Sequence, residues 1–227
     1  MIARLLAVGL AAGVLAGLFV SLVQMAKVTP LIHAAETYEA GAPAPHAHDG
    51  TEEPSHAHDG EAWAPADGLE RTFYTWMANA LTGIAYGLLL VAGFALSGRP
   101  VDWRRGILWG MAGFAAFALA PAALLPPELP GAAAAELSLR QGIWAGVALA
   151  TASGIALIAF ARPAALKALG VAIIAVPLLL PGPHGEGAGL VPPELAAEFV
   201  VATLLAAALF WAFLGGVSGF LFKRFVG

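Results

Sequence analysis

The chain lacks cysteine altogether and is poor in charge, since only 11% of its 227 residues are Asp, Glu, Lys or Arg. Without cysteine, disulfides, thiolate metal ligands and cysteine nucleophiles are excluded, so a metal site has to use histidine and carboxylate groups. Soluble domains carry about 25% charged residues. Together with a hydrophobic content of 59% and a mean hydropathy of +0.80, the shortage of charge indicates a membrane protein.

Sequence motifs of enzymes and nucleotide-binding proteins are also missing. The chain has no HExxH zinc motif, no GxSxG nucleophile motif, no GxxxxGK[ST] phosphate-binding loop and no GxGxxG dinucleotide motif. We therefore expect no enzymatic activity, no tightly bound cofactor and no nucleic-acid partner. Transport driven by ATP would require another subunit.

Long apolar runs are what the chain does contain. A membrane-spanning helix needs about 20 mostly apolar residues, and the sequence predicts one all-α integral membrane domain over residues 1–227. The expected bundle has about six spans, at residues 2–28, 72–97, 106–125, 141–161, 164–180 and 195–222. The fifth run is short and contains Pro177, so five spans with a re-entrant segment stay an open alternative. The first run exceeds the core of a signal peptide, about 7 to 15 residues, which favours a span.

Small residues recur at four-residue spacing in several runs, and such a stripe lets helix backbones approach closely. We expect tight helix packing along the two longest stripes, which are Gly9, Gly13, Gly17 and Ser21, and Gly142, Gly146, Ala150 and Gly154. The general glycine richness of membrane helices is the preferred interpretation of two shorter pairs, Gly106 with Gly110 and Gly215 with Gly219.

Basic residues predict the orientation, because Lys and Arg concentrate in cytoplasmic loops. With six spans and both termini in the cytoplasm, eight of the eleven basic residues fall inside, namely Arg4, Arg99, Arg104, Arg105, Arg162, Lys167, Lys223 and Arg224. Of the fifteen acidic residues only Asp102 joins them, and all six histidines fall outside. Imidazole with carboxylate suits divalent cobalt, nickel or zinc. We therefore expect a multi-pass protein of the cytoplasmic membrane whose outer face binds metal.

The outer loop over residues 41–68 contains the pentapeptide HAHDG twice. Its polar composition without hydrophobic periodicity predicts a disordered, flexible loop. Two imidazoles at i and i+2 can approach one metal ion, so His46, His48, His56 and His58 are candidate ligands. Such a site is weak because ordering the chain costs about 1 to 2 kcal/mol per residue, and weak binding suits capture and release. A solvated linker that contains histidine is the alternative.

Two other outer segments are better candidates for an ordered site. In VTPLIHAAETYE, His33 and Glu36 share a helical face at i and i+3, and Pro30 suits the first turn of that helix. An ordinary interfacial helix end is the alternative. In PGPHGEG, His184 and Glu186 follow prolines that restrict the backbone. A single histidine makes a poor site, so we expect these segments to act together.

The tetrapeptide PPEL occurs twice, at residues 126–129 and 192–195. We expect Glu128 and Glu194 to lie in the first turn of the helix that follows, where the helix dipole favours negative charge. The alternative is a carboxylate that lines the entry path.

No ionisable residue falls near the middle of a predicted span, where such residues usually mark ion or proton relays. The polar side chains inside the spans are expected mainly to make hydrogen bonds between helices, with the lining of an ion path as the alternative role. They are Gln24, Asn79, Thr82, Gln141, Thr151, Ser153 and Thr203.

Several blocks carry a family resemblance in their order along the chain. They are VTPLIHAAETYE, the His-bearing acidic loop, EAWAPADGLERTFYTWMAN, LAPAALLPPELPGAAAAELSLRQGIW, PGPHGEGAGLVPPELAAEFVVATLL and FWAFLGGVSGFLFKR. Over essentially its whole length the chain resembles the CbtA family, the larger subunit of a predicted cobalt transporter. The positions matching family motifs are His33, Glu36, Trp63, Glu70, Arg71, Glu128, Arg140, Gln141 and His184. Gly185 departs from the PHP run expected at His184.

The resemblance implies cobalamin-linked cobalt uptake, with Co²⁺ as the transported ion and a small single-span, His-bearing CbtB-like partner subunit. We therefore expect the multi-span subunit of a cobalt importer. A nickel or zinc permease is the alternative within transport, because ligand type barely separates these ions. A metal-binding membrane sensor or scaffold that transports nothing is the alternative from another class.

Overall fold

The structure is a computed structural model and describes residues 1–40, 65–183, 185 and 189–227. These residues form helices and no strands, which confirms the all-α prediction for the described part of the chain. In chain order the elements are α1 (Ile2–Lys27), α2 (Thr29–Ala40), α3 (Leu69–Ser97), α4 (Trp103–Phe114), the π-helical η1 (Ala115–Leu119), α5 (Ala120–Leu124), α6 (Leu137–Phe160), α7 (Ala164–Leu178) and α8 (Pro193–Phe225).

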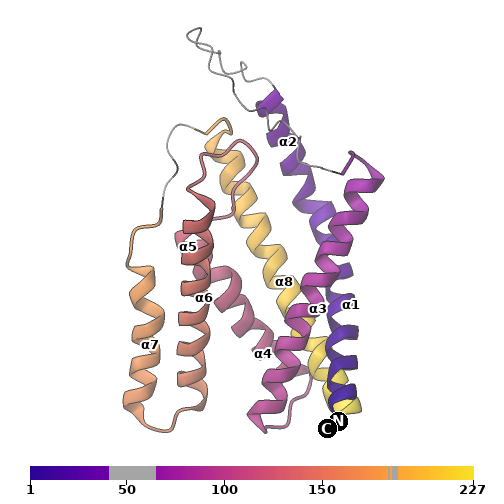
Figure 1. The fold of residues 1–227 in the computed structure, drawn as a ribbon, viewed down its shortest axis with the longest axis vertical. Coiled ribbons are helices and arrows are strands. Elements are labelled where there is room, and N and C mark those ends of the chain that lie inside the picture. The colour runs from indigo at the N-terminus through magenta and orange to yellow at the C-terminus, as the bar shows by residue number, and fades with distance from the viewer. Residues whose placement is uncertain (41–64, 184, 186–188) are drawn as a thin grey trace, which may run out of the picture.

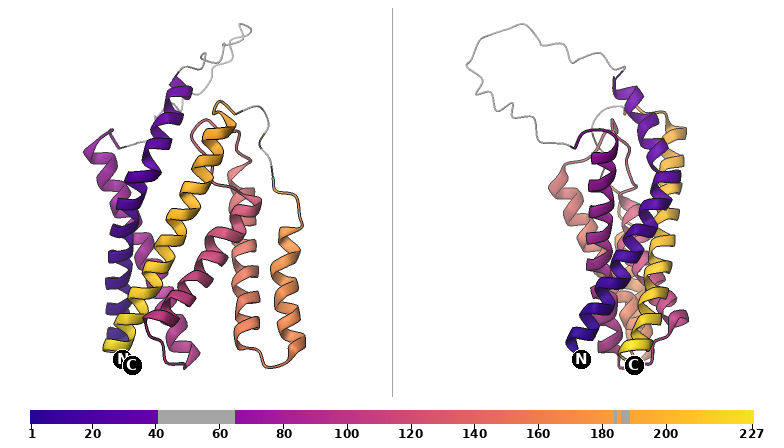
Figure 2. Two further views of the ribbon diagram at one scale, coloured as in Figure 1. Left: turned by 180° about the vertical axis from the view of Figure 1, so that it is seen from behind. Right: turned by 90° about the vertical axis from the view of Figure 1, so that its right-hand side faces the viewer.

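Both termini lie at one end of the bundle, beside the connections from α3 to α4 and from α6 to α7 (Figure 1). We call this the termini end, and the opposite end, where residues 65–68, 125–136 and 189–192 lie, the loop end. A second view confirms that successive long helices run in opposite directions (Figure 2). The chain therefore passes an even number of times between the two ends.

Five helical segments in the described residues are long and apolar enough to cross a membrane, and α4, η1 and α5 together make one of them, Trp103–Leu124. The predicted fifth span, at residues 164–180, corresponds to α7, which has only 15 residues and is not among these five. At 1.5 Å per residue such a helix covers about 22 Å, less than the hydrocarbon core of about 30 Å. Pro177 lies in its last turn. About six passages are thus compatible with the structure, with the predicted fifth span the shortest.

The first glycine stripe packs as predicted. Along α1, Gly13 lies against the backbone of Gly83 and Ile84 in α3, and Gly17 lies against Asn79 and its neighbour Ala80. A Cβ atom at Gly13 would meet backbone rather than a movable side chain, so the two helices would have to separate. Close backbone approach increases van der Waals contact, which drives helix association in lipid.

The short glycine pairs contradict the expectation that they merely reflect composition. Gly106 and Gly215 approach so closely that a Cβ on either would collide with the carbonyl oxygen of the other. Gly110 and Gly219 continue the contact along α4 and α8, against the backbone of Trp211 and Asp102 respectively. Sequence spacing alone did not distinguish these pairs, because each is only two residues long and the partner helix is far away in the sequence.

The second long stripe is only partly a packing surface. Gly154 in α6 lies against Gly170 and Ile174 of α7, as expected for a small-residue contact. A Cβ at Gly142 or Gly146 would meet nothing within 4 Å. The prediction of tight packing was therefore wrong for the first half of this stripe, where the helix face is open in the described part of the chain.

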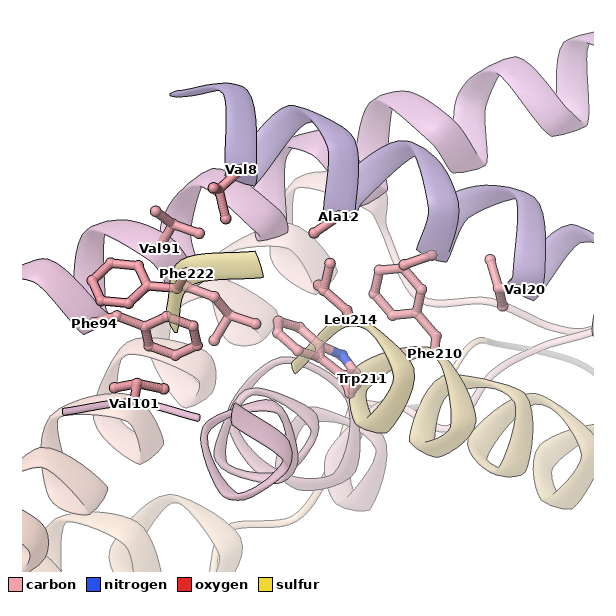
Figure 3. Close-up of a cluster of buried hydrophobic side chains, with 12 residues drawn as sticks. Val8, Ala12, Val20, Val91, Phe94, Val101, Phe210, Trp211, Leu214 and Phe222 are labelled. Carbon is pink, nitrogen blue, oxygen red and sulfur yellow. The ribbon is translucent and has the colours of Figure 1, made fainter. Parts of the chain in front are cut away.

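The largest buried cluster joins α1, α3, α4 and α8 near the termini end. Phe210 and Leu214 of α8 point toward α1 residues such as Ala12 (Figure 3). Trp211 of α8 points away from α1, and its ring stacks on that of Phe117 in η1 with centroids 5.7 Å apart. Nearer the termini, the rings of Phe94 and Phe222 pack edge to face with centroids 5.5 Å apart. Aromatic pairs of this kind add about 0.5–1.5 kcal/mol beyond simple burial. Four helices are thereby fixed into one unit that holds the loop end in place.

Candidate functional site

The predicted pair of His33 and Glu36 forms on α2 at the loop end. Val28 between α1 and α2 keeps α-helical torsion angles, so α2 extends α1 beyond the apolar span. Pro30 lies in the first turn of α2, where its missing N–H leaves no helical hydrogen bond unmade. His33 Nδ1 donates to Glu36 Oε2 at 3.0 Å, which confirms that the two side chains share a helical face.

Glu36 also binds a residue that the sequence did not connect with it. Arg71, at the start of α3, donates from Nη2 to Glu36 Oε1 at 2.6 Å and from Nη1 to Asp67 at 3.1 Å. The guanidinium of Arg71, and then the imidazole of His33, hold the pKa of Glu36 below its ordinary value of 4.5. The carboxylate is therefore stabilised in its charged form, and it ties α2 to α3.

This arrangement changes the chemical role of Glu36. Because the Nδ1 of His33 is occupied by the carboxylate, its Nε2 is the ring atom available to a metal ion. A carboxylate that fixes the ring of a ligating histidine is common around protein metal sites and raises the basicity of the ligand. The side chain of His33 is 57% exposed, so an ion can reach it from outside. In this geometry Glu36 orients the ligand more readily than it binds the ion itself.

Within the described residues, no group of three or more His, Asp and Glu side chains is close enough to hold a metal ion. The other predicted ligands, His46, His48, His56, His58, His184 and Glu186, lie outside the described residues. So does Trp63. Among the described residues, the candidate site therefore consists of His33 with Glu36 and Arg71.

A second ion pair lies across the loop end. Arg140 in α6 donates from Nη2 to Glu128 Oε2 at 2.7 Å. Glu128 lies in the connection between α5 and α6, so its predicted place in the first turn of a helix was wrong. That prediction is confirmed for Glu194, which lies in the first turn of α8. The helix start at α6 uses Glu136 instead, whose carboxylate accepts from the N–H groups of Ser138 and Leu139.

Arg140 lines a pocket of about 630 Å³ that lies among η1, α5, α6 and α8, toward the loop end. Most of the lining is apolar and aromatic, including Phe117 and Trp144. Gln141 and Thr203, both predicted as polar lining or packing residues, also contribute. The hydroxyl of Thr203 is buried and has no hydrogen-bond partner among the described residues, so other atoms of Thr203 form its part of the pocket wall.

The backbone around this pocket contains an irregularity that the sequence analysis missed. Phe117 lies in η1, and π-helical turns inside α-helices are frequent at functional sites. Pro121 follows four residues later in α5 and cannot donate a hydrogen bond to the carbonyl of Phe117. A proline inside an apolar run is a signal for such a local adjustment, whereas the pocket itself depends on α8 and carries no sequence signal.

Other polar residues of the predicted spans pack helices together. Asn79 in α3 donates to Ser21 Oγ at 3.0 Å and to Gln24 Oε1 at 2.6 Å, both in α1. Next to them, the indole N–H of Trp76 donates to Met25 Sδ at 3.3 Å. These contacts confirm helix packing as the role of Asn79 and Gln24.

An all-helical bundle with long apolar spans, small-residue helix contacts and polar groups gathered at its ends defines a multi-pass membrane protein. The family model described as "Probable cobalt transporter subunit (CbtA)" matches residues 2–223, nearly the whole chain. The chain therefore belongs to the CbtA family. No curated protein and no solved structure matched it in the corresponding comparisons.

Proposed function

We propose that this protein imports cobalt across the cytoplasmic membrane as the multi-span subunit of a transporter, with both termini in the cytoplasm. The main support for the proposal is the distribution of charge between the two ends of the bundle. The chain also belongs to a family of cobalt transporter subunits. The termini end holds the eight basic residues assigned to the inside, whereas the described carboxylates other than Asp102 lie toward the loop end. Positive loops favour the cytoplasm.

The driving force in this proposal is the membrane potential. An inside-negative potential favours cation entry by about 2.3 kcal/mol per charge per 100 mV, and a divalent ion gains about twice that. The interior of the described spans offers no ionisable relay that would couple uptake to protons. Downhill uptake of a divalent cation requires no such relay, so it is the mechanism that we propose.

Capture begins at the outer face. His46, His48, His56 and His58 bind ions weakly and raise their local concentration. His33 then receives an ion on Nε2, with Glu36 holding the ring, and His184 and Glu186 supply further ligands. The geometry on α2 supports the ordered step, because Glu36 is itself held by Arg71 at 2.6 Å.

The pocket beside Arg140 is the proposed start of the route inward. It lies toward the loop end, and its wall includes Arg140, Gln141 and Thr203. Its own polar groups are too few to replace the hydration shell of a divalent ion. A second subunit with metal ligands therefore completes the route, in keeping with the family description as a subunit. A single-span, His-bearing partner fits this requirement.

Uptake of radiolabelled cobalt by cells that lack other cobalt permeases tests the proposal. Cells expressing this chain with its partner subunit should accumulate cobalt, and excess nickel or zinc should compete less well than unlabelled cobalt. Equal competition by nickel would support the nickel alternative. No flux with both subunits present, despite metal binding by the purified protein, would instead identify a sensor or scaffold.

Two sets of variants separate the capture step from the route. Replacing the four loop histidines by alanine should lower uptake at low cobalt concentration and leave uptake at saturating cobalt unchanged. Ala207→Phe, which fills the pocket, should lower uptake at every concentration. Val201→Phe is the matched control because Val201 is on the same helix but 66% exposed, away from the pocket. Equal losses in the two phenylalanine variants would exclude the pocket as the route.

A further inference from the structure

A second groove, of about 520 Å³, lies at the termini end between the start of α1 and the end of α8. It combines two guanidinium groups with an apolar wall. Its lining residues are Arg4, Ala7, Val8, Ala11, Leu221, Arg224 and Phe225. None of them belongs to the candidate metal site or to the pocket at the loop end.

The guanidinium groups at this groove are not neutralised by carboxylates. Arg4 makes one long hydrogen bond, from Nη1 to the backbone carbonyl of Phe225 at 3.5 Å. The ion pairs in the described residues all lie at the loop end and include neither Arg4 nor Arg224. Asp102, the acidic residue of this end, lies near Lys223 and accepts a hydrogen bond from the backbone of Arg105. Both arginines are therefore available to an anion.

The apolar part of the groove points from the helix ends toward the middle of the bundle. From Arg4 to Ala11 the helix rises by about 10 Å, and the residues of α1 in the wall are small or apolar. Ala7 and Ala11 are exposed and carry no side chain beyond Cβ, so they leave a channel along the helix. A soluble anion would use the arginines only, whereas an anion with a hydrocarbon chain would use the arginines and the channel.

We propose that this groove binds an anionic phospholipid, with its phosphate between Arg4 and Arg224 and one acyl chain along Ala7, Ala11 and Leu221. Basic pockets between membrane helices are known to hold anionic headgroups, and arginine forms strong paired hydrogen bonds with phosphate oxygens. Because α1 and α8 pack on each other in the core, a bound lipid stabilises the contact between the first and last helices.

Thermal unfolding of the purified full-length protein in detergent tests this proposal. Phosphatidylglycerol should raise the Tm by several degrees relative to phosphatidylcholine with the same acyl chains. In the Arg4→Gln/Arg224→Gln variant this difference should fall by at least half. The Tm of that variant in phosphatidylcholine establishes that it still folds, and native mass spectrometry counts the lipid molecules retained by each protein.

The matched control is Arg162→Gln/Lys167→Gln, which removes two positive charges from the same end of the bundle but outside the groove. It should keep the full response to phosphatidylglycerol. An equal loss of response in both double variants would overturn the proposal, because the effect would then come from general surface charge. A response of the same size to inorganic phosphate alone would also overturn it, since the site would then bind a soluble anion.

The Ala11→Phe variant tests the place of the acyl chain. It narrows the channel and leaves both arginines intact, so it should reduce the phosphatidylglycerol response although the charge is unchanged. An undiminished response would show that the groove does not hold the chain.

Discussion

Glu36 in α2 accepts a hydrogen bond from Nη2 of Arg71 in α3 at 2.6 Å, although 35 positions separate the two residues. The same carboxylate accepts from the ring of His33. One acidic group thus orients a candidate metal ligand and joins the two helices that flank the histidine-rich loop. Arg71 also places a positive charge beside the carboxylate that holds His33, and this charge repels a metal ion bound to the His33 ring.

This repulsion predicts that Arg71→Gln increases cobalt affinity at His33. Unit charges 4 Å apart interact by about 1 kcal/mol in water, and cobalt carries two charges. Loss of the cation at that separation removes a repulsion of about 2 kcal/mol, so it should raise the affinity by up to about thirtyfold. Calorimetric titration with Co²⁺ measures this best in a protein whose four loop histidines are replaced by alanine. Arg140→Gln, at the other ion pair, should leave the affinity unchanged. If Arg71→Gln also leaves it unchanged, metal does not bind beside Glu36.

The lowered pKa of Glu36 predicts a specific acid sensitivity. The folded protein holds this proton less tightly than the unfolded chain, whose carboxyl titrates near 4.5. The stabilising effect of Glu36 is therefore complete above that pH and is lost as the pH falls through the lower folded pKa. Wild type should have a higher Tm than Glu36→Gln at pH 7, and the gap should narrow below pH 4.5. A gap that is constant with pH would show that charge on Glu36 contributes nothing.

The contact between Gly106 and Gly215 predicts that glycine-to-alanine substitutions have different effects at Gly106 and at Gly142. At Gly106 a Cβ atom would meet the backbone of Gly215, so Gly106→Ala should destabilise the protein by about 1–3 kcal/mol, the usual cost of overpacking. At Gly142 the space is open, and Gly142→Ala should be neutral or stabilise the helix by up to about 1 kcal/mol. Equilibrium unfolding in mixed detergent micelles measures both. The packing argument fails if the two variants lose the same stability.

The hydrogen bonds between α1 and α3 give a prediction for Asn79. Asn79→Leu removes donors to Ser21 and Gln24, and it should destabilise the fold by about 0.6–2 kcal/mol, the range for hydrogen bonds between membrane helices. Thr82→Val is the control, because Thr82 is one turn away on the same helix and exposed. The same unfolding assay applies. Equal stability of Asn79→Leu and wild type would show that these bonds contribute no net stability.

Local sequence signals predicted the features that depend on neighbouring positions. Apolar runs long enough to span a membrane predicted the long helices. The i, i+3 spacing predicted the contact between His33 and Glu36, because the geometry of a single helix places these two side chains on one face. The stripe from Gly9 to Gly17 predicted a packing surface. Element ends moved by a few residues, as for α3, which starts at Leu69 rather than at residue 72.

Features that depend on a second helix were predicted poorly. The contact between Gly106 and Gly215 was overlooked, and the open face at Gly142 was expected to be packed. Both cases have the same cause: a glycine permits close approach, but only a partner helix at the right angle makes use of it. The prediction that Glu128 lies in the first turn of a helix was wrong for a related reason. Glu128 instead forms an ion pair with Arg140 of α6.

The sequence by itself determined the membrane-protein class, the helical composition, the separation of basic from acidic residues and the family, since each follows from composition or from the order of residues along the chain. Tertiary structure decided which charges pair, which helices form the pocket beside Arg140, and that Arg4 and Arg224 line one groove. These features depend on helices that are distant in the sequence and adjacent in space. The angles between those helices follow from backbone contacts that the local sequence does not specify.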